Sequence, residues 1–247
     1  PDGKYIASGS DDKTIKIWEV SSGKCINTLT GHSDKVKSVS YSPDGKYIAS
    51  GSSDDTIKIW EVSSGRYIKT LVAEYDSITS IAYSPDGKYI ASGSLEATIK
   101  IWEVSSEECI NTLTGHSGFV NSVSYSPDGK YIASGSNDGT IKMWEVSSGK
   151  CINTLTSGDV NSVSYSPDGK YIASGSRDDT VKMWEVSSGR CISTLAGYSI
   201  TRSISYSPDG KYIASGYWEI LKIWEVSSGK CINTLTGHSN YVTSISY

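Results

Sequence analysis

No run of apolar residues in this sequence approaches the roughly 18 that a membrane-spanning helix needs, and its first residues do not form a signal peptide. Basic residues are not in excess either, since the formal net charge is −4, so nothing favours binding to nucleic acid or to an anionic membrane. The five cysteines lack the paired spacing of zinc ligands. We therefore expect no cofactor, no metal, no nucleic-acid partner and no membrane partner.

What the sequence has instead is repetition. A segment that begins Pro-Asp-Gly-Lys recurs at intervals of 42, 42, 42, 40 and 41 residues, starting at positions 1, 43, 85, 127, 167 and 208. Each copy contains four short runs rich in Tyr, Ile, Val, Thr and Trp, which suit β-strands. Ser-Pro-Asp-Gly-Lys and Ser-Ser-Gly segments between the runs are typical of tight turns. Four strands of about ten residues each, turns included, predict one propeller blade per copy.

The copies also resemble the WD-repeat family of β-propellers. Gly-His stands at residues 31–32, Ser-Gly-Ser precedes an Asp near the start of the copies, and Trp-Glu stands where the family usually has Trp-Asp, at 18–19, 60–61, 102–103, 144–145, 184–185 and 224–225. The resemblance covers the whole chain. It implies an all-β fold, a β-propeller of six four-stranded antiparallel blades, in a single domain spanning residues 1–247.

The ends of the sequence predict how the ring closes. A blade of this family runs from an innermost strand a to an outermost strand d, and this sequence begins at an a–b turn. Residues 240–247 (NYVTSISY) read as one more strand a, so we expect this C-terminal strand to complete the N-terminal blade in a monomer. A fragment of a seven-bladed ring is the alternative. Because the sequence starts inside a turn and without Met, we expect an excised or engineered segment.

The resemblance also implies sets of hydrogen-bonded side chains that stabilise the blades. Each set joins the His of Gly-His, a Ser of strand b that the sequence leaves open, the Trp of strand c and the Asp of the b–c loop. The predicted sets are His32 with Asp54 and Trp60, His116 with Asp138 and Trp144, and His238 with Asp12 and Trp18. Ser, His and Asp would also suit a catalytic triad, but no nucleophile elbow accompanies them. We expect no catalytic residue and no enzyme.

Variation among the copies is concentrated in the b–c and d–a loops, whereas the a–b turn is the same in all six copies and the c–d turn in five. In an up-and-down blade the two variable loops share one end, so they predict a single partner-binding face. Trp, Tyr and Arg are typical of interface hot spots. The predicted contact residues are Tyr75, Leu95, Phe119, Arg177, Tyr198, Ile200, Arg202, Tyr217, Trp218 and Tyr241. Alternatively, these side chains fill gaps left by the shortened loops.

We therefore expect a non-catalytic scaffold that recognises a protein or peptide, either as the sensor part of a larger protein or as a designed propeller. The alternative is a small-ligand or enzymatic site at the central channel. The residues predicted at this channel are polar: Lys37, Thr79, Asn121, Asn161, Arg202 and Thr243. They include no pair of carboxylates and no set of metal ligands. All five cysteines stand at one repeat position: Cys25, Cys109, Cys151, Cys191 and Cys231. We expect them to be free thiols with a packing role, in a protein of a reducing, cytoplasmic compartment.

Overall fold

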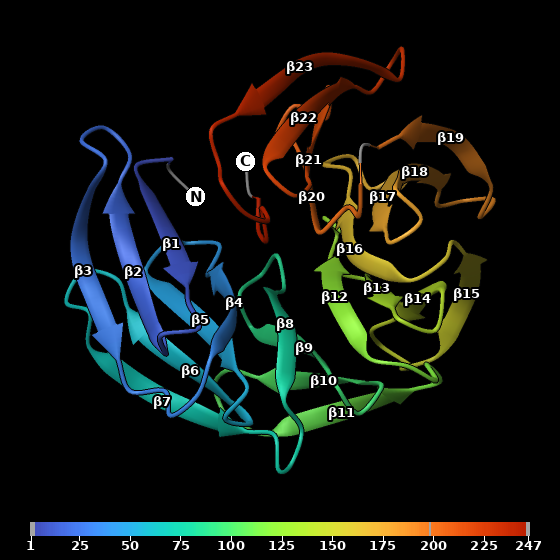
Figure 1. The fold of residues 1–247 in the computed structure, drawn as a ribbon. Coiled ribbons are helices and arrows are strands. Elements are labelled where there is room, and N and C mark those ends of the chain that lie inside the picture. Colours follow the sequence, from blue (N-terminus) through green and yellow to red (C-terminus); the bar gives the residue numbers. More distant parts are fainter. Residues whose placement is uncertain (1–2, 198, 246–247) are drawn as a thin grey trace. The chain divides into compact units, whose positions relative to one another are not determined.

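The computed structural model describes residues 3–197 and 199–245, and it consists of strands joined by turns. Within these ranges no residue is helical, so no helix is long and apolar enough to cross a membrane. The strands form six antiparallel sheets, one for each repeat, and every sheet is a meander of strands that follow one another in the chain (Figure 1). The predicted all-β, β-propeller fold class is confirmed.

The chain divides into two compact units, residues 1–114 and 115–247. The first unit contains three sheets. Their strands are β1 (Tyr5–Gly9), β2 (Thr14–Glu19) and β3 (Lys24–Thr30); β4 (Val36–Tyr41), β5 (Tyr47–Ser52), β6 (Thr56–Glu61) and β7 (Tyr67–Val72); and β8 (Ile78–Tyr83), β9 (Tyr89–Ser94), β10 (Thr98–Glu103) and β11 (Cys109–Thr114).

The second unit also contains three sheets, each with four strands. They are β12 (Val120–Tyr125), β13 (Tyr131–Ser136), β14 (Thr140–Glu145) and β15 (Cys151–Thr156); β16 (Val160–Tyr165), β17 (Tyr171–Ser176), β18 (Thr180–Glu185) and β19 (Cys191–Ala196); and β20 (Ser203–Tyr206), β21 (Tyr212–Gly216), β22 (Ile220–Glu225) and β23 (Lys230–Thr236). We number the blades one to six in chain order and name their strands a to d as above, so that β20–β23 form blade six.

The hydrophobic core lies between successive blades. On strand c the sequence TIKIWE alternates, so that Ile57 and Ile59 are buried while the intervening lysine is only half-buried. Within each unit, the Trp of a strand c packs against the preceding blade: Trp60 joins a cluster with Ile15 and Ile17 of blade one. Trp184 packs in the same way against residues of blade four. One repeat therefore cannot bury its own apolar face, and stacking of the repeats is what builds the core.

Serine hydroxyls on strand a connect neighbouring blades. The Ser122 hydroxyl accepts the Val163 N–H at 3.1 Å, and the Ser162 hydroxyl accepts the Ile204 N–H at 3.1 Å. The end of the chain continues this series, because the Ser203 hydroxyl accepts the Ile245 N–H at 2.8 Å. Residues 242–245 thus lie beside blade six where the strand a of a following blade would lie.

The predicted closing strand is not formed in the described part of the chain. Residues 241–245 belong to no strand, and residues 246–247 lie outside the described residues, as does Pro1. Five sheets have the predicted four strands, whereas the first has three, β1 to β3. The strand with which this segment was predicted to pair, β1, belongs to the first unit. Ring closure and the single domain remain predictions.

Candidate functional site

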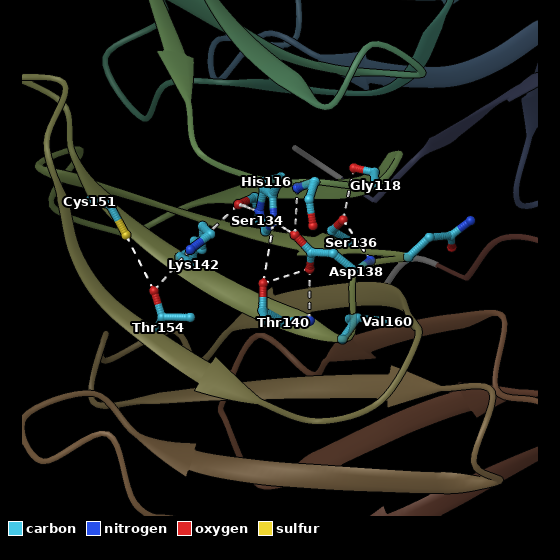
Figure 2. Close-up of polar contacts among 12 residues, drawn as sticks. His116, Gly118, Ser134, Ser136, Asp138, Thr140, Lys142, Cys151, Thr154 and Val160 are labelled. Atoms are coloured by element: carbon cyan, nitrogen blue, oxygen red, sulfur yellow. Dashed lines mark hydrogen bonds and ion pairs between the residues drawn. The ribbon is translucent and has the colours of Figure 1, made fainter.

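The most regular polar feature is a buried set of four side chains in blades two and four. In blade four, His116 Nδ1 lies 2.8 Å from Asp138 Oδ2 and its Nε2 lies 2.7 Å from the Ser134 hydroxyl, as Figure 2 shows. The Trp144 indole N–H donates to the same hydroxyl at 2.8 Å. Blade two repeats these contacts with His32, Asp54, Ser50 and Trp60, at distances between 2.7 and 2.9 Å. The contacts predicted for these two sets are present, and the strand-b serine that the sequence left open is Ser50 in blade two and Ser134 in blade four.

The aspartate and the histidine of the blade-four set differ in charge at pH 7. Burial alone would raise the pKa of Asp138, but hydrogen bonds from Thr140, the Ser117 N–H and His116 outweigh it and hold that pKa at about 2. Burial lowers the pKa of His116, although Asp138 opposes the shift. The imidazole is therefore neutral at pH 7. Its Nδ1–H donates to the carboxylate, and its Nε2 accepts the Ser134 O–H.

This Ser–His–Asp connectivity is that of a hydrolase triad, yet the serine cannot act as a nucleophile here. Ser134 is 0% exposed, and its oxygen already accepts the Trp144 N–H. A substrate carbonyl would have to reach that oxygen to be attacked. What the arrangement can do is connect the d–a loop, strand b, the b–c loop and strand c of one blade.

The third predicted set, His238 with Asp12 and Trp18, would join the two units, and it remains a prediction. His238 is exposed. Trp18 donates its indole N–H to Ser8 at 2.9 Å, and Asp12 accepts the Thr14 hydroxyl at 2.7 Å.

Sequence reasoning missed a different buried set in blade three. Asp76 is 4% exposed, lies 3.4 Å from Lys100 Nζ and accepts the Thr98 hydroxyl at 3.2 Å. In this copy Glu74 replaces the His and Leu95-Glu96-Ala97 replaces the usual Asp-containing loop, so both partners of the ordinary set are missing together. That joint loss is the signal from which a substitute ion pair could have been expected.

Tyr217 corrects the predicted binding face. It is 0% exposed, so it is not a surface contact residue. Its hydroxyl accepts the Ser215 O–H at 2.9 Å, and Ser215 in turn accepts the Trp224 indole N–H at 2.8 Å. In the repeat, Tyr217 stands at the last position of strand b, which is buried in the other complete blades, and the shortened loop leaves it there. The phenol thus occupies the hydrogen-bonding role that His has in blades two and four.

An exposed aromatic and cationic cluster is formed by Arg202, Trp218 and Tyr241, which we call the blade-six cluster. Trp218 is 50% exposed and Tyr241 38% exposed. Their ring centroids are 4.9 Å apart with an interplanar angle of 31°, and Arg202 Cζ lies 4.1 Å from the Tyr241 ring centroid. The three residues come from the loop before β20, the b–c loop after β21 and the segment after β23. Three predicted contact residues that are distant in sequence are therefore adjacent in the second unit.

The remaining predicted contact residues do not extend this cluster. Phe119 is exposed, and Arg177 is exposed with its guanidinium 3.7 Å from Asp159, but among the described residues neither makes a ring contact or an ion pair with the cluster. Ile200 is half-buried, and Tyr198 lies outside the described residues. Leu95 and Tyr75 are exposed on loops of the first unit.

Several residues predicted for a central channel are engaged in contacts within their own unit. Asn121 donates to Asn137 Oδ1 at 2.6 Å and to the Val160 carbonyl at 2.8 Å, and Asn161 donates to the Thr201 carbonyl at 3.0 Å. Lys37 pairs with Asp11 at 3.2 Å. Among residues 3–197 and 199–245, no three His, Cys, Asp or Glu side chains are grouped as metal ligands.

The prediction that the cysteines are packing residues was wrong. All five are free and exposed. Their repeat position is near the beginning of strand d, the last strand of each sheet, where one edge of the strand has no hydrogen-bonded neighbour within the sheet.

Comparisons with known proteins agree with this architecture. The model described as the second beta-propeller of echinoderm microtubule-associated protein matches residues 1–158, and the model of the WD domain, G-beta repeat, matches residues 149–185, 189–225 and 229–247.

Individual relatives match about one repeat each. The nuclear distribution protein PAC1 of Mycosarcoma maydis is 51% identical over 41 residues, which are 17% of this chain and 9% of that protein. A ribosome biogenesis protein BOP1 homolog of Culex quinquefasciatus is 59% identical over 44 residues, 17% of this chain and 5% of that protein. A Lissencephaly-1 homolog of Heterostelium pallidum is 51% identical over 39 residues, 16% of this chain and 9% of that protein. These matches therefore span less than a tenth of the relatives' length.

The family models together match residues 1–185, 189–225 and 229–247, and the tryptophans and hydrogen-bonded sets of blades two and four occupy the repeat positions that the sequence indicated. The chain belongs to the WD-repeat β-propeller family.

Proposed function

We propose that this chain is a non-catalytic scaffold that binds a protein or peptide through its b–c and d–a loops, with the blade-six cluster as the main contact. WD-repeat relatives are associated with protein interaction, which supports a binding role in general. The observation that favours this particular surface is the exposure of Trp218 and Tyr241 side by side on loops. A buried Tyr217 and hydrogen-bonded strand ends hold these loops in place.

A rigid platform is well suited to such contacts. Large aromatic rings lose little conformational entropy on docking, because each has only two rotatable side-chain bonds, and they bury a large area. We further propose that the chain acts as a monomer in a reducing compartment such as the cytoplasm, because five exposed thiols are open to oxidation. The net charge of −4 supports a partner other than nucleic acid.

The test begins with a displayed library of protein fragments selected on the immobilised chain, followed by calorimetry on the purified binders. Trp218→Ala should weaken the selected binders about thirtyfold, because a central aromatic contributes about 2 kcal/mol and each 1.4 kcal/mol is a factor of ten. The melting temperature should hardly change, since half of the Trp218 surface is already in solvent.

Lys130→Ala is the matched control. Lys130 lies in an a–b turn at the opposite end of its blade, where its side chain pairs with Asp128 at 3.8 Å. Binders that tolerate Trp218→Ala but are lost with Lys130→Ala would show that the other face binds the partner.

A further inference from the structure

The Arg202 guanidinium is held in place but not neutralised. It is exposed, and its Cζ lies 4.1 Å from the Tyr241 ring centroid, a cation–π contact. Among the described residues, no carboxylate lies within ion-pair distance of it, whereas Arg177 and Arg190 are paired with Asp159 and Glu185. A stacked guanidinium has already lost much of its side-chain freedom, so it can bind a planar anion at a smaller entropic cost.

From these contacts, and resting on the proposed function, we propose that the blade-six cluster recognises a peptide segment in which a carboxylate and an aromatic side chain lie on the same face. The Arg202 N–H edge receives the carboxylate, as guanidinium forks do in bidentate pairs. The exposed half of Trp218 receives the aromatic ring by offset stacking. Tyr241 contacts both Trp218 and Arg202 and so limits their separation.

The geometry of the cluster limits the spacing in the ligand. The Trp218 and Tyr241 centroids are 4.9 Å apart and Arg202 lies 4.1 Å beyond, so the tryptophan ring centre and the guanidinium are separated by about 9 Å at most. Alternate side chains of an extended strand share one face and lie roughly 6.6 Å apart, whereas consecutive side chains point to opposite faces. An aromatic residue and an acidic residue separated by one residue therefore fit the cluster.

The neighbouring charge sets the direction of the ligand. Glu219 directly follows Trp218 and is exposed. Its carboxylate repels an anion placed near the tryptophan, so the acidic end of the ligand lies over Arg202 and the aromatic end over Trp218. Glu219→Gln should therefore strengthen the binding of an acidic ligand about twofold.

The test uses fluorescence anisotropy with labelled peptides on the full chain. The probe is acetyl-Gly-Ser-Trp-Ser-Glu-Ser-Gly-amide, and the matched probe has Lys in place of Glu. A third peptide, ending in Trp-Ser with a free carboxyl group, distinguishes a chain terminus from an acidic side chain as the source of the carboxylate. We expect the acidic probe to bind at least ten times more tightly than the Lys probe at low salt. If only the third peptide binds, the carboxylate assignment holds and its source is the chain terminus.

Charge reversal gives the decisive comparison. Arg202→Glu should invert the preference in favour of the Lys probe, while Arg190→Glu, a reversal in the c–d turn of blade five, should leave it unchanged. Should Arg202→Glu fail to fold, as judged by circular dichroism, Arg202→Gln should bring the two affinities within about twofold of each other. Equal affinities for the two probes in the unaltered chain, or a preference that persists in Arg202→Gln, would overturn the proposal. If no probe binds while Trp218→Ala still weakens the library-selected partner, the ligand chemistry is wrong and the proposed function stands.

Discussion

Replacing His116 by alanine tests whether the buried Ser–His–Asp set stabilises the blade or performs chemistry. The His116 side chain is 0% exposed and bonds to Asp138 and Ser134. Neither partner is left without a bond in the variant, because Asp138 keeps the Ser117 N–H at 3.0 Å and the Thr140 hydroxyl at 2.6 Å, and Ser134 keeps the Trp144 N–H. The variant loses both hydrogen bonds of His116, and the Ser134 hydroxyl has the Lys142 carbonyl at 3.4 Å as its remaining acceptor. The main costs are therefore the charge-assisted bond to Asp138, about 2 kcal/mol, and a small cavity, about 1 kcal/mol.

We expect the free energy of unfolding to fall by about 2–3 kcal/mol, which moves the urea midpoint by about 1 M for a slope of about 3 kcal/mol per M. Tryptophan fluorescence and far-ultraviolet circular dichroism, followed in the same titration, measure that shift. Tyr75→Ala is the control, because Tyr75 is 92% exposed and its loss should change stability by less than about 0.5 kcal/mol. A His116→Ala protein of unchanged stability that has lost an activity would refute the structural role.

Three further predictions follow from the same contacts. Tyr217→Phe removes only the hydroxyl bonded to Ser215 and should lower the free energy of unfolding by about 1 kcal/mol, measured by urea denaturation. A loss of partner affinity without a loss of stability would contradict the buried position of Tyr217. Burial lowers the pKa of His32 and His116, so the unfolded chain binds protons that the folded chain excludes, and stability should fall as pH drops below the ordinary value of 6.5. Below pH 3.8 the low pKa of Asp138 adds to this loss of stability. Thermal melts from pH 7 to pH 3 measure the slope of melting temperature against pH, and the double variant His32→Ala/His116→Ala should have a flatter slope near pH 6. His238→Ala should cost about as much as His116→Ala if the ring closes and His238 meets Asp12, but less than about 0.5 kcal/mol if it stays exposed.

The repeat made most of the fold predictable from sequence. The alternation of TIKIWE determines which face of strand c is buried, and Pro-Asp-Gly places glycines such as Gly45, with a φ of 71°, where a tight turn needs a positive φ. The His32 and His116 sets were predictable too, because the same four residue types recur at fixed positions in a blade. The serine was left open because a complete strand b carries two serines, at 50 and 52 in blade two, and only the packing of Trp60 selects Ser50.

Departures from the repeat were harder to interpret, because a variable residue has no other copy to indicate its environment. Tyr217 and Trp218 are consecutive aromatic residues in one shortened loop, yet one is 0% and the other 50% exposed. Strand b ends at Gly216 and the chain bends at Trp218, so which of the two is buried depends on where the loop leaves strand b. The contact of Trp218 with Tyr241, and of Tyr241 with Arg202, depends on three segments meeting in space. The sequence by itself determined the blades, their turns and their repeated core, since these are local and periodic; only the tertiary structure decided which irregular side chains became core and which became surface.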